Sequence, residues 1–383
     1  MVNNLKRLLI IGGGFGGFSL ARRLEKSNLF KVILIDPSNY FVYMPLIHEI
    51  CVGKIPNNAV KIFFKNALKR TIHIKSIVKE IRFNENKAIL KNDKALFYDY
   101  LVIASGSIPN IPIEGSEGLP TLKTLKDANI IKRNILDALN EKNITISVVG
   151  EGATGIELVG EIASLSKNLK NRFKVHHFVY FNGYFLNIPK FNYAIQNRMR
   201  KLGVNVHLEE PVLKIVDKEI ITKRRKLKSD RIFVCTGVKP NIIKSDIQIE
   251  KGFPVDDFCQ IVGVDNAYAI GDVATFSTHG NTSIDLAQVA QKQAKFIVKD
   301  LIKKEKGVRR RPYKLKIMGI MISMGTYSAI SRLLDNYTIK GFLVWVMKRG
   351  YYFYNIIKMR RAPKLLKYFL ISLFVHDTFL GEI

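Results

Sequence analysis

The stretch LLIIGGGFGG, residues 8–17, decides the fold of this 383-residue sequence. Its four apolar residues predict a buried strand, and the pattern Gly12-x-Gly14-x-x-Gly17 overlaps the turn that follows. Residues 18–26 then have the spacing of a helix. Glycines at these positions permit a tight turn, let backbone N–H groups approach a pyrophosphate, and allow the helix to pack closely on its strand. The stretch therefore predicts a strand–turn–helix unit that binds a dinucleotide.

An acidic residue stands where such a unit needs one. The next predicted strand, Lys31–Ile35, leads directly into Asp36, which lies 19 residues after Gly17. A carboxylate at this place accepts hydrogen bonds from ribose hydroxyls. Asp36 therefore turns a generic glycine pattern into a specific nucleotide-binding fingerprint.

The same arrangement occurs again, with Gly150 lying 138 residues after Gly12. Residues 144–149 (ITISVV) predict a strand, Gly150-x-Gly152-x-x-Gly155 follows, and a helical pattern comes next. The following strand, Val175–Val179, leads into Tyr180-Phe181-Asn182, so neither a ribose acid nor an Arg for a 2′-phosphate is present. The second fingerprint predicts a nicotinamide nucleotide site and leaves NADH and NADPH both open. The alternative is a second domain that serves only as structure.

Alternating strands and helices predict an α/β fold of two Rossmann-like dinucleotide-binding domains with parallel sheets, the second inserted in the first. A flavoprotein that oxidises NAD(P)H requires two such domains, one for the flavin and one for the nicotinamide. The predicted domains are a discontinuous FAD-binding domain (1–112 and 259–303), an NAD(P)H-binding domain (113–258) and a C-terminal segment (304–383). The loop Pro109–Pro120 is the candidate linker, and a helix is predicted from Asp285 to Lys304.

The sequence carries a formal net charge of +29, from 61 Lys and Arg against 32 Asp and Glu. With 47% hydrophobic residues it is apolar enough for a large core, which excludes a disordered basic tail protein. Residues 303–383 hold 17 Lys and Arg against four Asp and Glu, so the charge is concentrated at the C-terminus. Three explanations fit this positive charge: binding to acidic lipid, binding to nucleic acid, or a proteome that is broadly basic.

Several classes of protein are excluded by what the sequence lacks. No stretch approaches the ~18 uncharged apolar residues of a membrane-spanning helix. The N-terminal apolar run leads straight into the glycine motif without a cleavage site, so it predicts a strand and not a signal peptide. Cys51, Cys235 and Cys259 form no CxxC and no close pair, so neither a disulfide framework nor a metal site is indicated. We expect three buried thiols in a reducing compartment.

Five segments together carry a family resemblance. They are Gly12–Gly17 with Asp36, Ala104–Pro109, residues 150–161 (GEGATGIELVGE), Cys235-Thr236-Gly237 and Ala269-Ile270-Gly271-Asp272. In combination they resemble the two-dinucleotide-binding-domain flavoproteins, over roughly residues 5–300. Within that superfamily the chain looks most like the type II NADH dehydrogenases, which are single-subunit NADH:quinone oxidoreductases bound to one membrane face. Residues 40–46, residues 287–293 (AQVAQKQ) and the basic, apolar C-terminal tail support this choice.

The resemblance implies two sets of cofactor-binding residues. For FAD they are Gly12, Gly14, Phe15, Gly16, Gly17, Asp36, Val78, Ala104, Gly271, Asp272, Ala287 and Gln288. For NAD they are Gly150, Gly152, Gly155, Glu157, Tyr180 and Gly237. Asp272 is expected to accept a hydrogen bond from the flavin ribityl chain. The Ala287–Gln288 backbone is expected to approach the flavin pyrimidine edge at the N-terminus of a helix.

The resemblance also implies four catalytic residues. Gln288 and Gln291 match the quinone-side motif, and Glu157 looks like the carboxylate that relays protons toward the quinone. Lys348 is similar to a C-terminal basic residue near the quinone. The alternatives are a solvated helix face for Glu157 and a membrane-facing charge for Lys348.

Other functions compete with this one. The sulfide:quinone oxidoreductases need a redox cysteine pair beside the flavin, and no cysteine here falls where that family carries its pair. Disulfide reductases need a CxxxxC after the first helix, and the sequence has none. A basic flavoprotein that acts mainly as a nucleic-acid-binding module is the third alternative. Because no basic helix or base-stacking motif is visible, no nucleic acid is expected.

The C-terminal segment consists of short apolar runs, residues 341–347, 351–359 and 364–371, separated by Lys348-Arg349 and Arg360-Arg361. We expect helices that lie in the headgroup plane, with the cations on anionic lipid. The single tryptophan, Trp345, suits the interface. The alternative is an ordinary packing domain or a dimer interface.

These observations predict a monotopic flavoenzyme on the cytoplasmic face of a membrane. It is expected to pass a hydride from NADH to FAD and two electrons on to a quinone. Because no spanning helix is predicted, we expect no proton pumping. The expected cofactors are FAD and NADH, with NADPH as the alternative donor. The expected partners are a quinone and an anionic membrane surface, with a homodimer left open.

Overall fold

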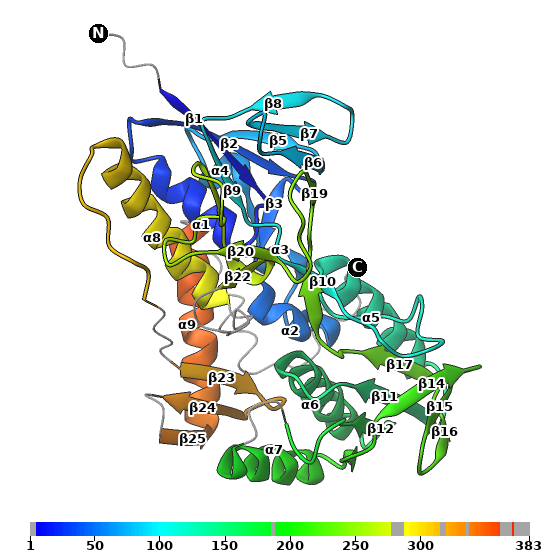
Figure 1. The fold of residues 1–383 in the computed structure, drawn as a ribbon. Helices are drawn as coiled ribbons and strands as arrows, with labels where there is room; N and C mark the ends of the chain where they lie inside the picture. The colour runs from blue at the N-terminus through cyan, green and yellow to red at the C-terminus, as the bar shows by residue number, and fades with distance from the viewer. Residues whose placement is uncertain are drawn as a thin grey trace. The chain divides into compact units, whose positions relative to one another are not determined.

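The computed structural model describes residues 5–184, 188–276, 287–314, 319–333, 337–360 and 370 (Figure 1). Its chain divides into two units. Unit 1 comprises Met1–Phe41, Ile62–Ile108 and Lys239–Ile317, and unit 2 comprises Val42–Lys61, Pro109–Val238 and Met318–Ile383. Each unit contains a glycine fingerprint at the edge of a parallel sheet of at least four strands, so the predicted α/β fold is confirmed.

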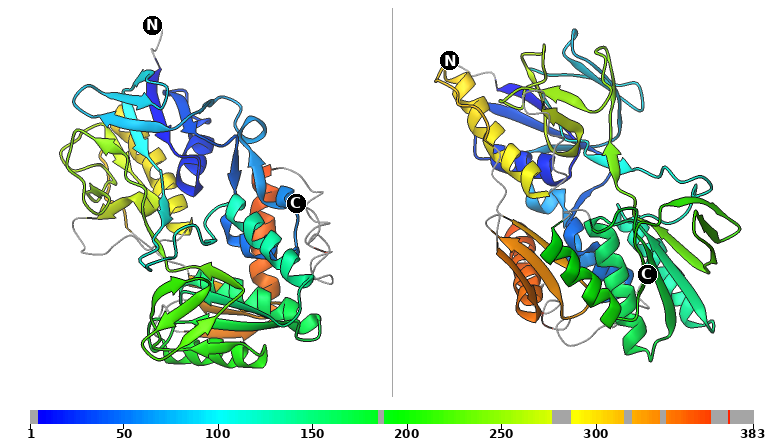
Figure 2. Two further views of the ribbon diagram at one scale, coloured as in Figure 1. Left: turned by 90° about the vertical axis from the view of Figure 1, so that its right-hand side faces the viewer. Right: turned by 60° about the horizontal axis from the view of Figure 1, so that its bottom comes forward.

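A five-stranded parallel sheet lies at the centre of unit 1, in the order β21-β9-β1-β2-β5. Its strands are β21 (Ala267–Ala269), β9 (Tyr100–Ile103), β1 (Lys6–Ile11), β2 (Phe30–Asp36) and β5 (Ile72–Lys75). β1 is paired on both sides, which explains why Leu8–Ile11 is buried and uniformly apolar. The helices α1 (Phe15–Leu24) and α8 (Ala287–Glu305) pack side by side (Figures 1 and 2). Asp285, where this second helix was predicted to begin, lies outside the described residues.

Smaller sheets complete unit 1. The first contains β19 (Lys244–Ser245), β6 (Val78–Arg82), β7 (Lys87–Leu90) and β8 (Ala95–Phe97), and the second pairs β20 (Phe253–Val255) with β22 (Ala274–Phe276). A single hydrophobic cluster joins them to the central sheet, and Val78 is a buried member of it. The helix α4 (Phe64–Ala67) and the 3-10 turn η2 (Gly271–Val273) also belong to this unit. Short strands at the crossings between units are β3 (Tyr40–Val42), β4 (Lys61–Phe63), β10 (Ser107–Pro109) and β18 (Val238–Pro240).

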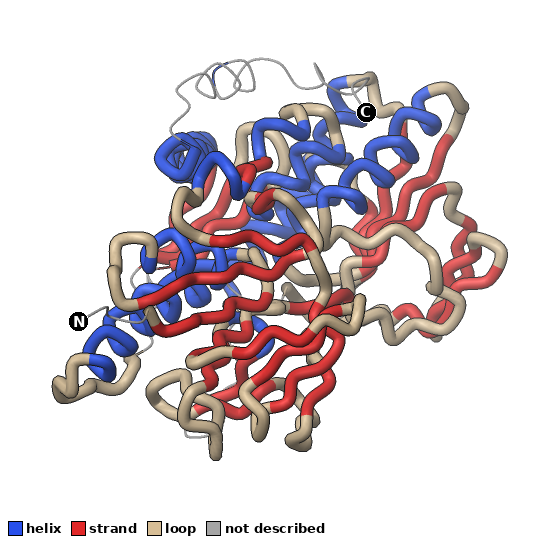
Figure 3. Tube along the Cα trace, turned by 90° about the horizontal axis from the view of Figure 1, so that it is seen from above, coloured by secondary structure: helices blue, strands red, loops and turns tan. Residues whose placement is uncertain are grey.

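Unit 2 has its own parallel sheet, in the order β13-β12-β11-β17. Its strands are β13 (Asn205–His207), β12 (Phe173–Phe178), β11 (Ile144–Val149) and β17 (Arg231–Val234). The helices of this part are α5 (Leu125–Leu139), α6 (Ala153–Asn168) and α7 (Pro189–Lys201). A capping box between Thr124 and Asp127 starts α5 and satisfies two backbone donors at its N-terminus. Figure 3 shows these strands gathered into sheets with helices against them.

The Pro109–Pro120 loop is part of the core of unit 2 and not a free linker. Ile113 is buried in one cluster with Ile215 and Ile220. These two residues come from β14 (Val212–Val216) and β15 (Glu219–Thr222), which form an antiparallel sheet with β16 (Lys226–Lys228). Glu114 also forms a β-bridge with Lys214. The turn residues suggested a linker, but the apolar side chains between them pack inward.

The first and last parts of the chain supply further elements of unit 2. Residues 42–61 contribute the turn η1 (Met44–Leu46), α2 (Ile47–Cys51) and α3 (Asn57–Val60). The C-terminal part forms an antiparallel sheet of β23 (Gly319–Ser323), β24 (Ala329–Leu333) and β25 (Tyr337–Gly341), against which α9 (Phe342–Arg360) packs (Figure 2). These units divide the chain at positions other than the predicted domain boundaries, and the predicted domains stay a prediction.

The C-terminal prediction needs three corrections. The runs 341–347 and 351–359 do not form two short helices, because one continuous helix, α9, begins at Phe342, after Gly341 ends β25, and includes the second run. Trp345 is fully buried and does not reach an interface. Lys348 and Arg349 are buried too, because carboxylates from other segments of unit 2 bind them. The remaining run, 364–371, lies almost wholly outside the described residues. No helix in the described part of the chain is long and apolar enough to cross a bilayer.

Candidate functional site

In unit 1 the first glycine motif forms the turn between β1 and α1. Gly12 has φ +98°, and a Cβ there would collide with the carbonyl oxygen of Ala104. At Gly14, in contrast, no described atom lies within 4 Å of a Cβ position, so the turn leaves open space at the helix N-terminus. Among the described residues α1 has no side-chain cap and no acid in its first turn. Its first N–H groups are therefore oriented to bind a pyrophosphate.

Asp36 faces this turn from the end of β2. Its Oδ2 accepts a hydrogen bond from the Gly13 N–H at 2.6 Å, and its Oδ1 accepts one from the Ser38 N–H at 2.7 Å. Burial raises the pKa of the Asp36 carboxyl above its ordinary value, although both N–H donors oppose this shift. The carboxylate is thus fixed beside the glycine turn, in the place from which it accepts ribose hydroxyls.

The Gly271-Asp272 turn lies in the same unit. The Ser107 hydroxyl donates a hydrogen bond to Asp272 Oδ2. The Gly271 N–H donates to Oε1 of Gln293 at 2.8 Å, and this glutamine is fully buried on α8. Gln293 therefore positions the turn that carries Asp272. Gln288 and Gln291, which the sequence analysis selected from the same motif, are half-buried on α8.

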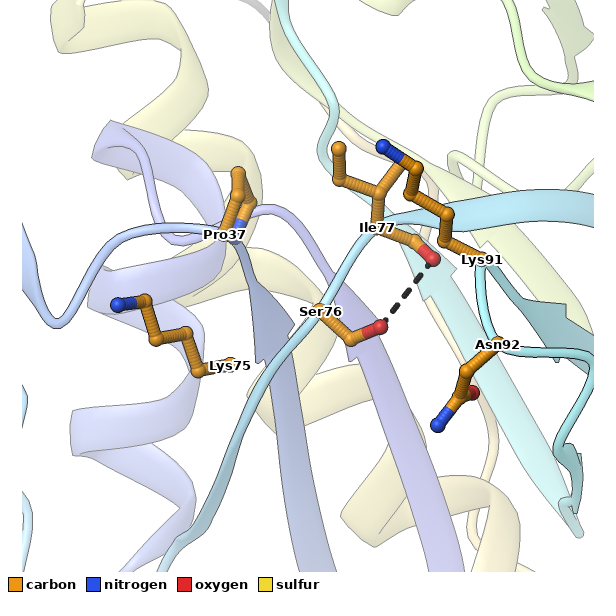
Figure 4. A pocket seen from close by; sticks show the side chains of 6 residues that line it. All are labelled: Pro37, Lys75, Ser76, Ile77, Lys91 and Asn92. Atoms are coloured by element: carbon orange, nitrogen blue, oxygen red, sulfur yellow. Dashed lines mark hydrogen bonds between the residues drawn. The ribbon is translucent and has the colours of Figure 1, made fainter.

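A shallow pocket of about 410 Å³ lies next to the Asp36 strand end. It is lined by Pro37, Lys75, Ser76, Ile77, Lys91 and Asn92 (Figure 4). The Ser76 hydroxyl donates to the Ile77 carbonyl at 3.4 Å and so is turned back onto the backbone. Sequence reasoning selected none of these residues, although Val78 follows directly. The glycine turn, the Asp36 carboxylate and the Asp272 turn together fit a bound dinucleotide, which agrees with the predicted FAD.

Unit 2 repeats the geometry of the first glycine turn. Gly150 has φ +126°, and a Cβ there would collide with the carbonyl oxygen of Cys235. The Gly152 position again has no described atom within 4 Å of a Cβ. His177 on β12 also binds this turn, because its Nε2 donates to the Gly150 carbonyl at 2.9 Å. Burial lowers the pKa of His177 to about 4, so the ring is neutral and holds the turn with one tautomer.

Glu157, four residues after the first residue of α6, is the centre of a buried charged cluster. Its carboxylate is 14% exposed and forms an ion pair with the Lys348 ammonium from α9. The same ammonium donates to Ser323 Oγ at 2.7 Å, and the Ser323 N–H donates to Glu157 Oε1 at 3.2 Å. Tyr352 lies below the ammonium, 5.4 Å from ring centroid to Nζ. The structure therefore brings together two residues that the sequence analysis selected 191 positions apart.

His48 completes this cluster from α2. Its Nδ1 lies 3.4 Å from Glu157 Oε2, and its buried Nε2 has no hydrogen-bond partner among the described residues. Burial lowers the pKa of His48 well below its ordinary value, and the nearby Lys348 ammonium adds to the shift. Burial raises the pKa of the Glu157 carboxyl, although Lys348 opposes this. The arrangement holds a carboxyl and a neutral imidazole in contact, which suits the transfer of a proton.

A second layer of ion pairs surrounds the first. Lys54 forms an ion pair with Glu161, one helical turn after Glu157, and donates to Thr326 Oγ1 at 2.7 Å. Arg349 Nη2 lies 2.8 Å from Glu49 Oε2. All four charged side chains are buried. These pairs tie α2, α6 and α9 together.

Sequence reasoning missed His48, Glu49, Lys54, Glu161 and Arg349. A signal was present in part, since Glu157 and Glu161 stand four residues apart and are the charged residues of α6 before its last turn. Charged residues inside an apolar helix indicate buried partners. The partners themselves lie in segments more than 100 residues away, which spacing along the chain does not reveal.

Other selected residues occupy different places. Tyr180 is 60% exposed just beyond the end of β12, and Gly237 follows β17, with its carbonyl accepting a hydrogen bond from the Asn110 N–H. Val78 lies in the hydrophobic core of unit 1. Their roles toward a cofactor stay predictions.

Comparison with known proteins shows which family has this architecture. Residues 6–294, three quarters of the chain, match the pyridine nucleotide-disulphide oxidoreductase family. The chain belongs to this family. Within this oxidoreductase all three cysteines are free and buried, and burial raises the pKa of Cys235 to about 12. Cys51 and Cys259 are shifted upward in pKa for the same reason, so none of the three is an activated thiolate.

The match between this oxidoreductase and two of its relatives spans different shares of the relatives' own length. The type II NADH:quinone oxidoreductase of Haemophilus influenzae is 22% identical over 395 residues, which cover 87% of this chain and 88% of that protein. The mitochondrial external alternative NAD(P)H-ubiquinone oxidoreductase B2 of Arabidopsis thaliana is 25% identical over 71% of this chain. The match spans only 55% of the Arabidopsis protein.

Solved structures of similar fold support the architecture of the oxidoreductase. NDH2 from Plasmodium falciparum in complex with NADH has a TM-score of 0.84 at 19% identity, covering 98% of this chain and 99% of that one. The sulfide:quinone oxidoreductase of Aquifex aeolicus has a TM-score of 0.83 at 16% identity, covering 97% and 96%. At these identities the two structures establish the fold alone.

Proposed function

We propose that the protein is a type II NADH:quinone oxidoreductase, which takes a hydride from NADH and passes two electrons to a quinone through bound FAD. The observation that carries this proposal is the repetition of one glycine turn, with the same close approaches and the same open position, in both units. Two nucleotide sites on one chain suit a flavin and a nicotinamide. The names of the relatives from Haemophilus and Arabidopsis point to the same reaction.

The residues of unit 1 hold the flavin nucleotide. The N-terminus of α1 and the Gly12–Gly17 turn bind its pyrophosphate, and Asp36 accepts its ribose hydroxyls. Asp272, oriented by Ser107, is a hydrogen-bonding group for the ribityl chain. When bound, the flavin accepts two electrons from a hydride donor and releases them to a second substrate.

The residues of unit 2 bind the nicotinamide nucleotide and supply a proton to the quinone. The Gly150–Gly155 turn binds the nucleotide pyrophosphate at the N-terminus of α6. Reduction of a quinone to a quinol consumes two protons. Glu157 is the carboxyl that supplies one of them, because burial raises its pKa above the ordinary value and it contacts the imidazole of His48. Lys348 orients this carboxyl through the ion pair and the shared contact with Ser323.

Membrane association belongs to the same proposal. One face of α9 is exposed although it is apolar, with Leu343 at 74% exposure and Met347, Tyr351 and Tyr354 on the turns that follow. The opposite face holds the buried Trp345, Lys348 and Arg349. Such a helix carries its charges inside and its apolar side chains outside, which is the reverse of a soluble surface helix. The exposed face suits insertion into the headgroup region, where the quinone is delivered.

Anaerobic mixing of the purified protein, reconstituted with FAD, tests the proposal. NADH is expected to bleach the visible flavin absorbance, and a short-chain quinone is expected to restore it. Sulfide is the control donor, and it should leave the flavin oxidised. If NADH and NADPH both fail while sulfide bleaches the flavin, the proposed donor is wrong. If NADH bleaches the flavin and no quinone restores it, the proposed acceptor is wrong.

A further inference from the structure

The second fingerprint has an acid, but it stands in the turn and not at the end of the strand. The pairing registers allow the two units to be compared residue by residue. In unit 1 Ile11 pairs with Ile35, and Asp36 follows Ile35. In unit 2 Val149 pairs with Phe178, so the residue that corresponds to Asp36 is Val179. Val179 is apolar and completely buried, and it offers no carboxylate to a ribose.

The glycine turns of the two units also differ, and here it is unit 2 that carries the acid. Gly12-Gly13-Gly14 corresponds to Gly150-Glu151-Gly152, so Glu151 takes the place of Gly13. A Cβ at Gly13 would lie 3.0 Å from Oδ2 of Asp36. The side chain at this position therefore points toward the place that the ribose acid occupies in unit 1. In unit 2 that position carries a carboxylate of its own.

The hydrogen bonds are reversed between the two units. In unit 1 the strand acid Asp36 accepts from the turn N–H of Gly13. In unit 2 the turn acid Glu151 accepts, through Oε2, from the N–H of Tyr180 just past the end of β12, at a long 3.5 Å. Each bond links the glycine turn to the chain just past the neighbouring strand, although Tyr180 lies one position beyond the equivalent of Asp36. Glu151 is half-buried, so its second oxygen is within reach of a ligand.

We propose that Glu151 is the ribose-binding acid of unit 2 and that it selects NADH over NADPH. This inference rests on the proposed function. A carboxylate accepts hydrogen bonds from the 2′- and 3′-hydroxyls of the adenosine ribose. The 2′-phosphate of NADPH would meet that carboxylate as a like charge and would have no hydroxyl to donate. Besides Glu151, two carboxylates come from residues bonded to the chain just past β12, because the N–H groups of Glu209 and Glu210 donate to the carbonyls of Phe181 and Val179.

Arg224 is the cation that competes with this interpretation. Its Nη2 lies 3.9 Å from Glu209 Oε2, and both side chains are about half exposed. A 2′-phosphate that paired with Arg224 would reverse the preference. The two residues therefore predict opposite results, and substitutions at each of them separate the two cases.

Equilibrium titration of the FAD-loaded protein with NAD⁺ and NADP⁺ tests the inference without turnover. The wild type is expected to bind NAD⁺ at least about tenfold more tightly than NADP⁺, since a charge-assisted hydrogen bond contributes ~1.5–3 kcal/mol. E151Q keeps an acceptor for the Tyr180 N–H and removes the charge. It is expected to reduce the NAD⁺ to NADP⁺ preference by about tenfold, whereas E151A should also weaken NAD⁺ binding itself. In flavin reduction, E151A should raise the KM for NADH and leave the limiting rate unchanged.

E117Q is the matched control, because Glu117 is an exposed carboxylate of unit 2, and it should leave the preference as in the wild type. An unchanged preference in E151Q, or a wild type that prefers NADP⁺ and loses that preference in R224Q, overturns the inference while the proposed function stands. A wild type that binds neither nucleotide overturns the proposed function, and the inference with it. Thermal unfolding of each variant shows that the fold is retained.

Discussion

At the residue scale the decisive feature is a buried carboxyl with two different neighbours. Glu157 contacts a cation, Lys348, on one side and a neutral imidazole, His48, on the other. Burial raises the pKa of the carboxyl and lowers the pKa of the imidazole. A carboxyl that is easier to protonate, in contact with a neutral imidazole, suits the transfer of a proton. Sequence alone indicated Glu157 and Lys348, but not that they touch.

Replacing Glu157 tests its role as a proton donor. E157Q removes the proton that the carboxyl supplies, so reoxidation of the flavin by quinone should slow by about 10²-fold. Reduction of the flavin by NADH should change less than about twofold, because hydride transfer needs no such proton. Stopped-flow absorbance measures the two half-reactions separately. Equal slowing of both half-reactions would remove the proposed role, and E117Q serves as the control.

The pH dependence of stability reports on His48. Because the pKa of His48 in the folded protein lies below its ordinary value of 6.5, the unfolded chain binds a proton near pH 6 that the folded protein does not. The free energy of unfolding therefore falls as the pH decreases through this range, by up to ~1.4 kcal/mol per pH unit for one such group. H48Q lacks this proton site, so its stability should fall less steeply between pH 7 and pH 5. Urea unfolding at several pH values measures the slopes, and identical slopes would contradict the prediction.

At the element scale α6 connects the nucleotide turn to the C-terminal part of unit 2. A Cβ at Gly160 would lie 2.6 Å from the Gly325 nitrogen, so the helix and the β23–β24 turn approach with no side chain between them. Arg198 on α7 binds the same turn through the carbonyl oxygens of Met324 and Thr326. This contact places Ser323 beside Glu157. The sequence showed the glycines of the fingerprint, but the close approach of Gly160 to Gly325 appears only in the tertiary structure.

The exposed face of α9 is testable as a membrane contact. Introducing a carboxylate at Leu343 or Met347 places charge on the apolar face, without touching the buried face of the same helix. L343D and M347D should therefore reduce binding to anionic vesicles by about tenfold or more, since each charge opposes both burial and the lipid headgroups. Sedimentation with vesicles measures the bound fraction. K358Q, which removes one charge at the far end of α9, is the control and should bring only a small, salt-dependent loss. If both aspartate variants bind vesicles as well as the wild type does, this face does not enter the membrane.

At the scale of the whole molecule the chain returns to unit 2 after passing through unit 1. Residues 42–61, 109–238 and 318–383 belong to the same unit, so its buried charges come from the beginning, the middle and the end of the chain. Glu49, Glu157 and Arg349 represent those three parts. Formation of the cluster therefore requires the C-terminal residues to be in place. The C-terminal part therefore stabilises unit 2, in addition to its proposed role as a membrane anchor.

Truncation after residue 340 should destabilise unit 2. It removes Lys348 and Arg349 and leaves the Glu157 and Glu49 carboxylates buried without their partners, which costs roughly 3–5 kcal/mol for each broken pair. Truncation after residue 360 keeps α9 complete and should keep most of the stability. Differential scanning calorimetry of the two truncated proteins measures the difference. Equal unfolding temperatures would show that the ion pairs are not needed.

The sequence by itself determined the features that depend on neighbouring residues. Backbone geometry at Gly12 and Gly150 and the burial of two-sided strands are local, so LLIIGGGFGG and its repeat specified two nucleotide-binding folds. The tertiary structure alone decided which distant side chains meet. Lys348 and Arg349 look like surface charges in an apolar run, and they became buried because carboxylates from α2 and α6 satisfy them. Pairing register likewise showed that Val179, and not Tyr180, corresponds to Asp36, which directs attention to Glu151. Ion pairs and register depend on which faces come together, and spacing along a single chain does not contain that information.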